Sequence, residues 1–297
     1  MGEIVQSRIV LVLLVSWGFL GAGCVSGPEK RPRVSYRTSA KENFIKGKKS
    51  FEDGDYLEAA EFFKFVKSKF PYSAFATQSD LYLADCDYER DRFMEAADKY
   101  RNFVKLHPRN QKVPYAMFRV GLCHFEQIPD EWWFSPPAHE MDQSETVRTI
   151  REFEYFLKRF PQDEYVPKAQ EYLKKCKLRM AEQVMYVLNF YRKRDHHRAV
   201  LWRADELLKK YSGLGYDEEA LYYKSQAQVE LEELQGARET LHQLLARFPK
   251  GDYASAAKKM MNKLGPGKKP APAAKTKPPK KAPAPKKAPE KVEGVPP

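Results

Sequence analysis

The sequence predicts an all-α fold: an α-solenoid of about five helix pairs, followed by a disordered Lys/Pro-rich C-terminal tail. The first observation behind this prediction is a phrase ending in Pro that closes a helical apolar run at four places: Lys69-Phe-Pro71, Leu106-His-Pro108, Arg159-Phe-Pro161 and Arg247-Phe-Pro249. The second is an offset of 37 residues that relates the first two of these prolines and several apolar pairs, including Ala59/Ala96 and Phe63/Tyr100. The third is the tail, because residues 265–297 contain ten Pro and nine Lys and nothing that forms a core.

Residues 1–23 have the pattern of a signal peptide. Arg8 precedes an apolar-rich run that ends at Leu20, and the small residues Gly21-Ala22-Gly23 follow. A run of this length is too short to span a bilayer comfortably as a permanent helix. We therefore expect export across a membrane, followed by removal of this segment.

Cys24 follows these small residues, an ending that resembles the lipobox of bacterial lipoproteins, in which the Cys is lipidated and becomes the new N-terminus. The sequence departs from that pattern because Leu20 stands one position early. We expect lipidation of Cys24, with residues 24–38 as a lipid-anchored basic linker; an ordinary cleaved signal is the alternative. In the system that it resembles, Val25 after the Cys favours the outer membrane.

The repeat units follow along the chain. Each is expected to hold two helices, the first with a small residue where its partner approaches, and the second stopped by Pro, which lacks an N–H and clashes with the preceding turn. The pattern Gly…Tyr-x-x-Ala-x-x-x-Phe…Pro in residues 47–71 resembles the tetratricopeptide repeat. We expect units at 39–71, 76–108, 113–161, 165–211 and 216–249 and a capping helix to Leu264. They form an N-terminal module (39–161, repeats 1–3) and a C-terminal module (162–264, repeats 4–5 and the cap).

Three cysteines share one position in successive units. Cys86, Cys123 and Cys176 each lie 15 residues after a Pro that ends a repeat. Equivalent sites on stacked helices lie about 10 Å apart, which exceeds the roughly 7 Å Cα separation that a disulfide allows. We therefore expect free, buried thiols.

The third unit carries an insertion between Phe125 and Thr146. It contains the consecutive aromatic residues Trp132, Trp133 and Phe134 and then Pro136-Pro137, which cannot be helical. These aromatic side chains either plug the helices or form a contact surface. We expect Asp142 or Ser144 to be the N-cap of a helix that restarts at Thr146.

The formal net charge of +12 lies towards the two ends of the chain, outside residues 51–264. Residues 28–50 carry +6 and residues 265–297 carry +7, whereas residues 51–264 carry −1. A near-neutral body argues against a nucleic-acid groove, so we expect no nucleic acid partner. The basic flanks favour an anionic membrane surface.

Catalytic chemistry has no motif in this sequence. Gly-x-Ser-x-Gly, a Gly-rich phosphate loop and His-Glu-x-x-His do not occur. His196-His197 has no Cys or carboxylate at a zinc-ligand spacing. We expect no enzyme activity, no cofactor and no metal site.

Aromatic and apolar residues recur at the 37-residue offset on the predicted first helices, in the columns Phe44/Leu81/Phe118 and Phe51/Tyr88/Phe125. First helices line the concave surface of such a solenoid, and these columns run along it or just beneath it. We expect them to bind an extended peptide with aromatic side chains. Packing between repeats is the alternative, which we expect for half of them.

The lipidated N-terminus, the five units, the elongated third unit with Asp142-Gln143, and the stretch from Phe190 to Trp202-Arg203 together resemble the BamD family of outer-membrane β-barrel assembly lipoproteins. The resemblance covers about residues 24–260. It implies a periplasmic scaffold at the outer membrane that binds C-terminal signals of unfolded barrel proteins. The C-terminal module would dock the last periplasmic domain of BamA, beside other assembly-complex lipoproteins.

By the same resemblance, Tyr191, Arg194 and Arg203 match functional positions of the family. Arg203 would pair with an acidic residue of BamA, because the planar fork of Arg binds a carboxylate bidentately. The alternative for Arg203 is a helix-surface Arg beside Asp205 and Glu206. An independent repeat scaffold that associates with the cell wall or another periplasmic complex is the competing functional class.

Overall fold

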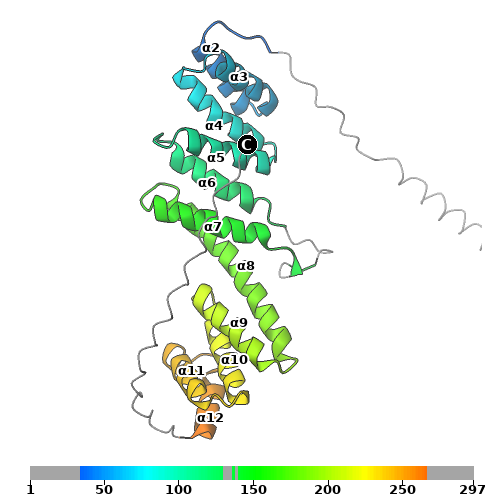
Figure 1. The fold of residues 1–297 in the computed structure, drawn as a ribbon, viewed down its shortest axis with the longest axis vertical. Helices are drawn as coiled ribbons and strands as arrows, with labels where there is room; N and C mark the ends of the chain where they lie inside the picture. Colours follow the sequence, from blue (N-terminus) through cyan, green and yellow to red (C-terminus); the bar gives the residue numbers. More distant parts are fainter. Residues whose placement is uncertain (1–33, 130–135, 138–139, 266–297) are drawn as a thin grey trace, which may run out of the picture. The chain divides into compact units, whose positions relative to one another are not determined.

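A computed structural model describes residues 34–129, 136–137 and 140–265. Cys24, the aromatic run Trp132–Phe134 and the Lys/Pro-rich tail therefore lie outside the described residues. The predicted all-α class is confirmed, since the described residues form α-helices, with 3-10 geometry at Glu140 and no strand. The helices are α2 (Ala40–Glu52), α3 (Tyr56–Lys69), α4 (Ala74–Tyr88), α5 (Phe93–Leu106), α6 (Val113–Phe125), α7 (Ser144–Arg159), α8 (Val166–Arg192), α9 (His197–Lys210), α10 (Asp217–Glu230), α11 (Leu234–Arg247) and α12 (Ala254–Leu264) (Figure 1).

The chain divides into two compact units. Unit 1 comprises the described residues up to Val187 together with Lys210–Leu214, and unit 2 comprises Leu188–Lys209 and the described residues from Gly215 onward. The division falls inside α8, a helix of 27 residues, and not after Pro161 where the sequence suggested a module boundary. No helix within the described ranges is both long and apolar enough to cross a membrane.

Unit 1 is built from helices that pack against their neighbours in the chain, as Figure 1 shows for α2 to α7. The small residues predicted at the helix approaches are required there. A Cβ added to Gly121 would lie 2.6 Å from Cε1 of Phe153, and one added to Gly47 would lie 2.9 Å from Cβ of Phe62. The pairs at the 37-residue offset, Ala59/Ala96 and Phe63/Tyr100, are fully buried.

Pro closes the second helix of a pair in the way that the sequence predicted. In α3, for example, the helix ends at Lys69, and Phe70 leaves the helical region with φ −131° and ψ 52°. The residue before a Pro is disfavoured in the α region, so the helix stops before Pro71. α5, α7 and α11 end in the same way, each two residues before its Pro.

The restart of the chain after the insertion differs from the prediction. α7 begins at Ser144, two residues before Thr146, and its boundary residue Gln143 makes no side-chain cap. The Asp142 carboxylate accepts hydrogen bonds from the backbone N–H of Ser144, at 3.0 Å, and from its hydroxyl group. Asp142 thus binds the first turn from just outside the helix.

The predicted burial of the three repeat-related cysteines is confirmed. Each is a free thiol within the described residues, and none is more than 1% exposed. Burial raises the thiol pKa to about 12 in each case: Cys86, Cys123 and Cys176. They are core residues and poor nucleophiles at neutral pH.

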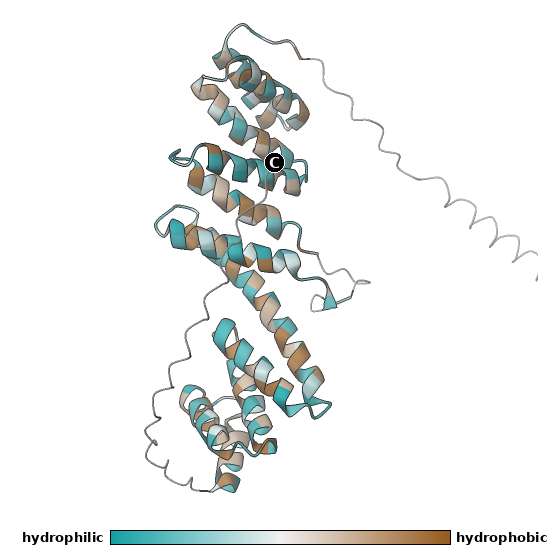
Figure 2. Ribbon diagram, viewed as in Figure 1, coloured by the Kyte–Doolittle hydropathy of each residue, from teal (hydrophilic) through white to brown (hydrophobic). Residues whose placement is uncertain are grey.

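The core of unit 2 is centred on α10 and α11. Leu221, Leu241 and Leu244 are fully buried and pack with Ala257 of α12. In Figure 2, brown and teal residues alternate along these helices, which is the pattern of helices with one buried face. α12 therefore closes the described part of this unit, as predicted for a capping helix.

Candidate functional site

Unit 1 contains a hollow of about 320 Å³. It is bounded by residues on or next to α2, α4 and α6, the first helix of each pair, and by the segment before α8. Aromatic rings from four positions line it, together with two basic and two acidic side chains. The lining residues are Phe51, Leu81, Tyr82, Asp85, Glu89, Lys112, Tyr115, Arg119 and Tyr165. This mixture suits an uncharged ligand with apolar and aromatic groups.

Arg119 of α6 is the best-anchored charged group of the hollow. Its Cζ lies 3.6 Å from the centroid of the Tyr88 ring. Its Nε donates to the hydroxyl of Tyr100 at 2.9 Å, and one terminal nitrogen donates to Glu89 at 3.2 Å. With its side chain only 13% exposed, Arg119 has a single well-defined position.

Asp85 of α4 lies below the same hollow and is 7% exposed. Its Oδ1 accepts hydrogen bonds from the hydroxyls of Tyr100 and, at 2.7 Å, Tyr115, and lies 3.9 Å from Arg119. Burial raises the pKa of this carboxyl above its ordinary value, against the hydrogen bonds and Arg119, which lower it. Three groups thus contact Oδ1 of Asp85, so this carboxyl positions Arg119 and the tyrosines.

The six residues predicted to bind a peptide divide between the hollow and the core. Phe51 and Leu81 line the hollow. Tyr88 lies beside Arg119 and donates to Glu126 at 3.2 Å, while Phe125 is half-buried with its ring 4.6 Å from that of Tyr172.

For Phe44 and Phe118 the expectation of direct peptide contact requires correction. They are 6% and 4% exposed, and their rings pack against other rings of the core, such as those of Phe63 and Tyr165. The physical reason is that this column lies where one helix pair meets the next, so its rings are enclosed by both. Packing between repeats, the stated alternative, describes them.

Sequence reasoning missed the column immediately beside it. Tyr82 and Arg119 are 37 residues apart, each one position after a residue of the Phe44/Leu81/Phe118 column. Because successive helical residues differ by about 100° in direction, Tyr82 and Arg119 line the hollow, whereas Phe44 and Phe118 face the core. Leu81 of the first column also lines the hollow. The same offset that revealed the core column was the signal for this one.

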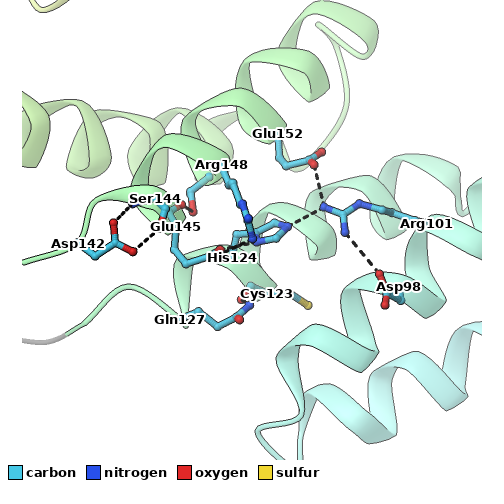
Figure 3. A network of polar contacts seen from close by, with 11 residues as sticks. Asp98, Arg101, Cys123, His124, Gln127, Asp142, Ser144, Glu145, Arg148 and Glu152 are labelled. Atoms are coloured by element: carbon cyan, nitrogen blue, oxygen red, sulfur yellow. Dashed lines mark hydrogen bonds and ion pairs between the residues drawn. The ribbon is translucent and has the colours of Figure 1, made fainter.

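A second polar cluster joins α5, α6 and α7, as Figure 3 shows. His124 is 2% exposed, with Nδ1 2.7 Å from Glu145 and Nε2 2.6 Å from a terminal nitrogen of Arg101. A guanidinium only donates, so Nε2 accepts and Nδ1–H donates to Glu145. Arg101 also donates to Glu152 at 2.9 Å.

This cluster has no nucleophile to activate. The neighbouring Cys123 thiol has a pKa raised to about 12 by burial. The part of the chain that the structure describes also contains no group of three His, Cys, Asp or Glu side chains placed to hold a metal ion. We interpret the His124 cluster as a hydrogen-bond network that stabilises the packing of α5, α6 and α7.

In unit 2, the segment from Phe190 to Arg203 spans the end of α8, the turn and the start of α9. Arg194 lies in the turn, with its Cζ 3.5 Å from the centroid of the Phe190 ring, and its guanidinium donates to the Phe190 carbonyl at 3.2 Å. The half-buried Tyr191 packs edge-on against Phe190. Arg203 donates to Glu206 at 2.6 Å within α9, with its side chain 41% exposed.

Trp202, which sequence reasoning did not assign, is the most exposed aromatic side chain of this segment. It is 66% exposed, and Phe190 is 42% exposed. The signal was its position on α9 between Val200 and Ala204, which are buried, so that Trp202 must face outward. Tyr191, Arg194, Arg203 and these two rings are the residue types that dominate protein interfaces.

Comparisons with solved structures find weak overall similarity to repeat proteins. The TPR2AB-domain:pHSP90-complex of yeast Sti1 is 15% identical, with a TM-score of 0.36, and the match covers 76% of this chain and 98% of that chain. A thermophilic TPR protein from Thermus thermophilus is 11% identical, with a TM-score of 0.32 over the same shares.

Comparisons with curated proteins and families are more specific. The outer membrane protein assembly factor BamD of Neisseria gonorrhoeae is 25% identical over 253 residues, which cover 83% of this chain and 94% of that protein. BamD of Vibrio cholerae is 25% identical over 191 residues, 64% of this chain and 78% of that protein. The family described as "YfiO: Outer membrane lipoprotein" matches residues 37–240, and the chain therefore belongs to this family, which includes BamD.

Proposed function

We propose that this protein is a non-enzymatic lipoprotein scaffold in outer-membrane β-barrel assembly. In this proposal the hollow of unit 1 binds the C-terminal signals of unfolded barrel proteins, and the Phe190–Arg203 segment of unit 2 docks the periplasmic domain of BamA. Family membership supports the assembly role, since the curated relatives are named outer membrane protein assembly factors.

The observation that carries the proposal is the hollow built from Phe51, Tyr82, Tyr115 and Tyr165 around Arg119. Its rings offer edges and faces to an aromatic side chain. Its charges balance, because Asp85 and Glu89 offset Lys112 and Arg119, so an uncharged side chain enters without leaving an unpaired ion. A barrel-strand segment that ends in an aromatic residue supplies such a side chain, and in this proposal its terminal carboxylate stays in water outside the hollow.

The docking surface is supported by side-chain exposure. A Trp that is 66% exposed costs solvation free energy unless a partner covers it. Arg203 already pairs with Glu206 on the surface. A carboxylate of BamA would therefore either bind the same guanidinium beside Glu206 or replace Glu206. Either arrangement changes a partly solvated pair into a more buried one, which strengthens it when both charges stay hydrogen-bonded.

Membrane attachment completes the proposal and rests on the sequence. Cys24 would carry the lipid, and several acyl chains together would hold it stably at the periplasmic face of the outer membrane. Labelling with a clickable fatty acid tests this directly. Label should be present in the natural chain and absent from Cys24→Ala.

Peptide binding is tested by photo-crosslinking to a peptide that ends in Phe. Phe51→Ser should reduce crosslinking several-fold, because it removes one wall of the hollow. Ile45→Ser, on the same helix and 53% exposed but outside the hollow, is the matched control and should crosslink normally. Equal crosslinking by all three proteins would contradict the peptide site.

Docking is tested by co-purification with BamA from detergent extract. Arg203→Glu and Trp202→Ala should each lower the yield of BamA with unchanged helical content. Arg92→Glu is the matched control, since Arg92 also pairs with a Glu three residues later, Glu95, and is 46% exposed. If another periplasmic protein dominates the eluate and BamA is absent, the competing scaffold function is favoured.

A further inference from the structure

The guanidinium of Arg119 has only part of its hydrogen-bonding and stacking capacity satisfied within the protein. Tyr88 covers one face, with 3.6 Å between Cζ and the ring centroid. Nε and one terminal nitrogen are occupied by Tyr100 and Glu89, so two of the three nitrogens are fixed in the plane. These contacts define the plane of the cation before any ligand arrives.

Arg119 forms part of the wall of the hollow. Arg119 borders the hollow and Tyr88 does not. Tyr115 also borders it, with its ring centroid 5.8 Å from Cζ of Arg119, and the remaining aromatic walls are Phe51, Tyr82 and Tyr165. The Tyr100 ring centroid lies 5.8 Å from the same Cζ. A planar cation that stacks on Tyr88 and borders a ring-lined hollow can accept a further ring from a ligand.

The charges around the hollow favour entry of the aromatic side chain of the peptide over entry of its terminal carboxylate. Asp85 lies 3.9 Å and Glu89 3.2 Å from Arg119, so two carboxylates already pair with this cation. A further carboxylate would meet both of them and would lose its hydration. An uncharged ring loses little hydration and gains the electrostatic attraction of a cation that is largely withdrawn from water.

We propose that Arg119 recognises an aromatic side chain of the bound peptide by cation–π stacking, as the middle layer of a Tyr88–Arg119–ligand stack. This inference rests on the proposed peptide-binding function of the hollow. It gives the hollow a selectivity for aromatic over aliphatic side chains of equal size. Lys at this position would keep the positive charge but would lack the planar guanidinium group that stacks on a ring.

The test is a fluorescence-anisotropy titration of the intact protein with labelled peptides that differ only in their terminal side chain: Phe, mono-, di- and trifluoro-Phe, and cyclohexylalanine. Fluorine withdraws electron density from the ring while its apolar surface is kept. Affinity should therefore fall stepwise along the fluorine series and be lowest for cyclohexylalanine, by about 10- to 30-fold overall. Because the series varies only the ligand, it requires no folding of a variant.

Variants locate the effect. In Arg119→Lys the peptide affinity should vary less across the fluorine series than it does in the natural protein. Arg159→Lys is the matched control and should leave that dependence unchanged, because Arg159 lies 5.3 Å from the Phe160 ring but does not line the hollow.

Three outcomes would overturn the inference, and they differ in what they leave standing. If all peptides bind equally well, the hollow takes side chains by apolar burial alone and peptide binding stands. If C-terminal amidation abolishes binding and fluorination does not affect it, Arg119 or Lys112 takes the terminal carboxylate. If no peptide binds, the proposed function of the hollow fails together with the inference.

Discussion

Replacing Phe118 with Ala separates a core role from a binding role at a position where the sequence suggested peptide contact. The side chain is 4% exposed, and its ring stacks on Tyr165 at 4.9 Å and packs against Phe153 at 5.8 Å. Truncating a fully packed Phe removes its transfer free energy and leaves a cavity, which together cost about 3–5 kcal/mol. This is a large share of the roughly 5–15 kcal/mol by which domains are stable.

The assay is unfolding of the purified protein, followed by circular dichroism with heat and with urea. A loss of this size lowers Tm by roughly 6–20 °C, at about 2–4 °C for each kcal/mol in a domain of this size. Phe51→Ala is the comparison, because Phe51 is half-buried and lines the hollow. It should lose about 1–2 kcal/mol, in proportion to the smaller apolar area that it buries.

The two variants should also differ in peptide binding. At temperatures where it is folded, Phe118→Ala should lose less peptide binding than Phe51→Ala, because it removes only the stacking partner of Tyr165 and no wall of the hollow; Phe51→Ala should bind weakly and remain folded. The reasoning would be refuted if Phe118→Ala lost less than about 1 kcal/mol of stability and no longer bound peptide. Phe118 would then be a surface residue, and the packing of α6 against α7 and the Tyr165 segment would be wrong.

Three further predictions concern unit 1. The stability of Asp85→Asn relative to the natural protein should rise as the pH increases from 4 to 7.5. Burial raises the pKa of Asp85, so ionising this carboxyl in the folded natural protein costs stability above the pKa of the unfolded chain. Urea titrations across this pH range check the sign, and the opposite trend would show that Arg119 outweighs burial. Gly121→Val should lose about 1–3 kcal/mol by overpacking against Phe153, measured by urea unfolding, whereas Gly54→Ala, with open space around it, should show no steric loss and only the strain of its positive φ. Iodoacetamide at pH 8 should label Cys86, Cys123 and Cys176 only after denaturation, as measured by peptide mapping with mass spectrometry. Rapid labelling of the native protein would contradict the burial of these thiols.

Much of the fold could be predicted because the same helix–helix contacts recur in successive repeat units. Gly121 and Gly47 are small because a neighbouring Phe occupies the space of a Cβ, and Phe70 ends α3 because Pro71 follows it. Each of these is a local consequence of chain chemistry. The start of α7 was misplaced by two residues because Asp142 binds the first turn from outside the helix.

The candidate site could be predicted only in part. Phe51, Leu81 and Tyr88 carried the sequence signal, whereas Arg119 was one residue beside it. Which column of a helix faces the hollow depends on where the adjacent helices cross it, and a 37-residue offset is the same for both columns. Trp202 was missed because its outward direction follows only once Val200 and Ala204 are known to be buried.

The sequence by itself determined the helical class, the repeat register, the helix ends at Pro, and the position of most of the +12 charge towards the two ends of the chain. These features depend on backbone chemistry and on the order of residues along the chain. Tertiary structure alone decided which of the repeated aromatic residues are core and which line the hollow. It also decided that Arg119 is fixed by Tyr88, Tyr100 and Glu89, which come from two other helices and the turn between them. The reason is that burial and hydrogen-bond partnership are properties of side chains brought together across helices, and no single stretch of sequence contains both partners.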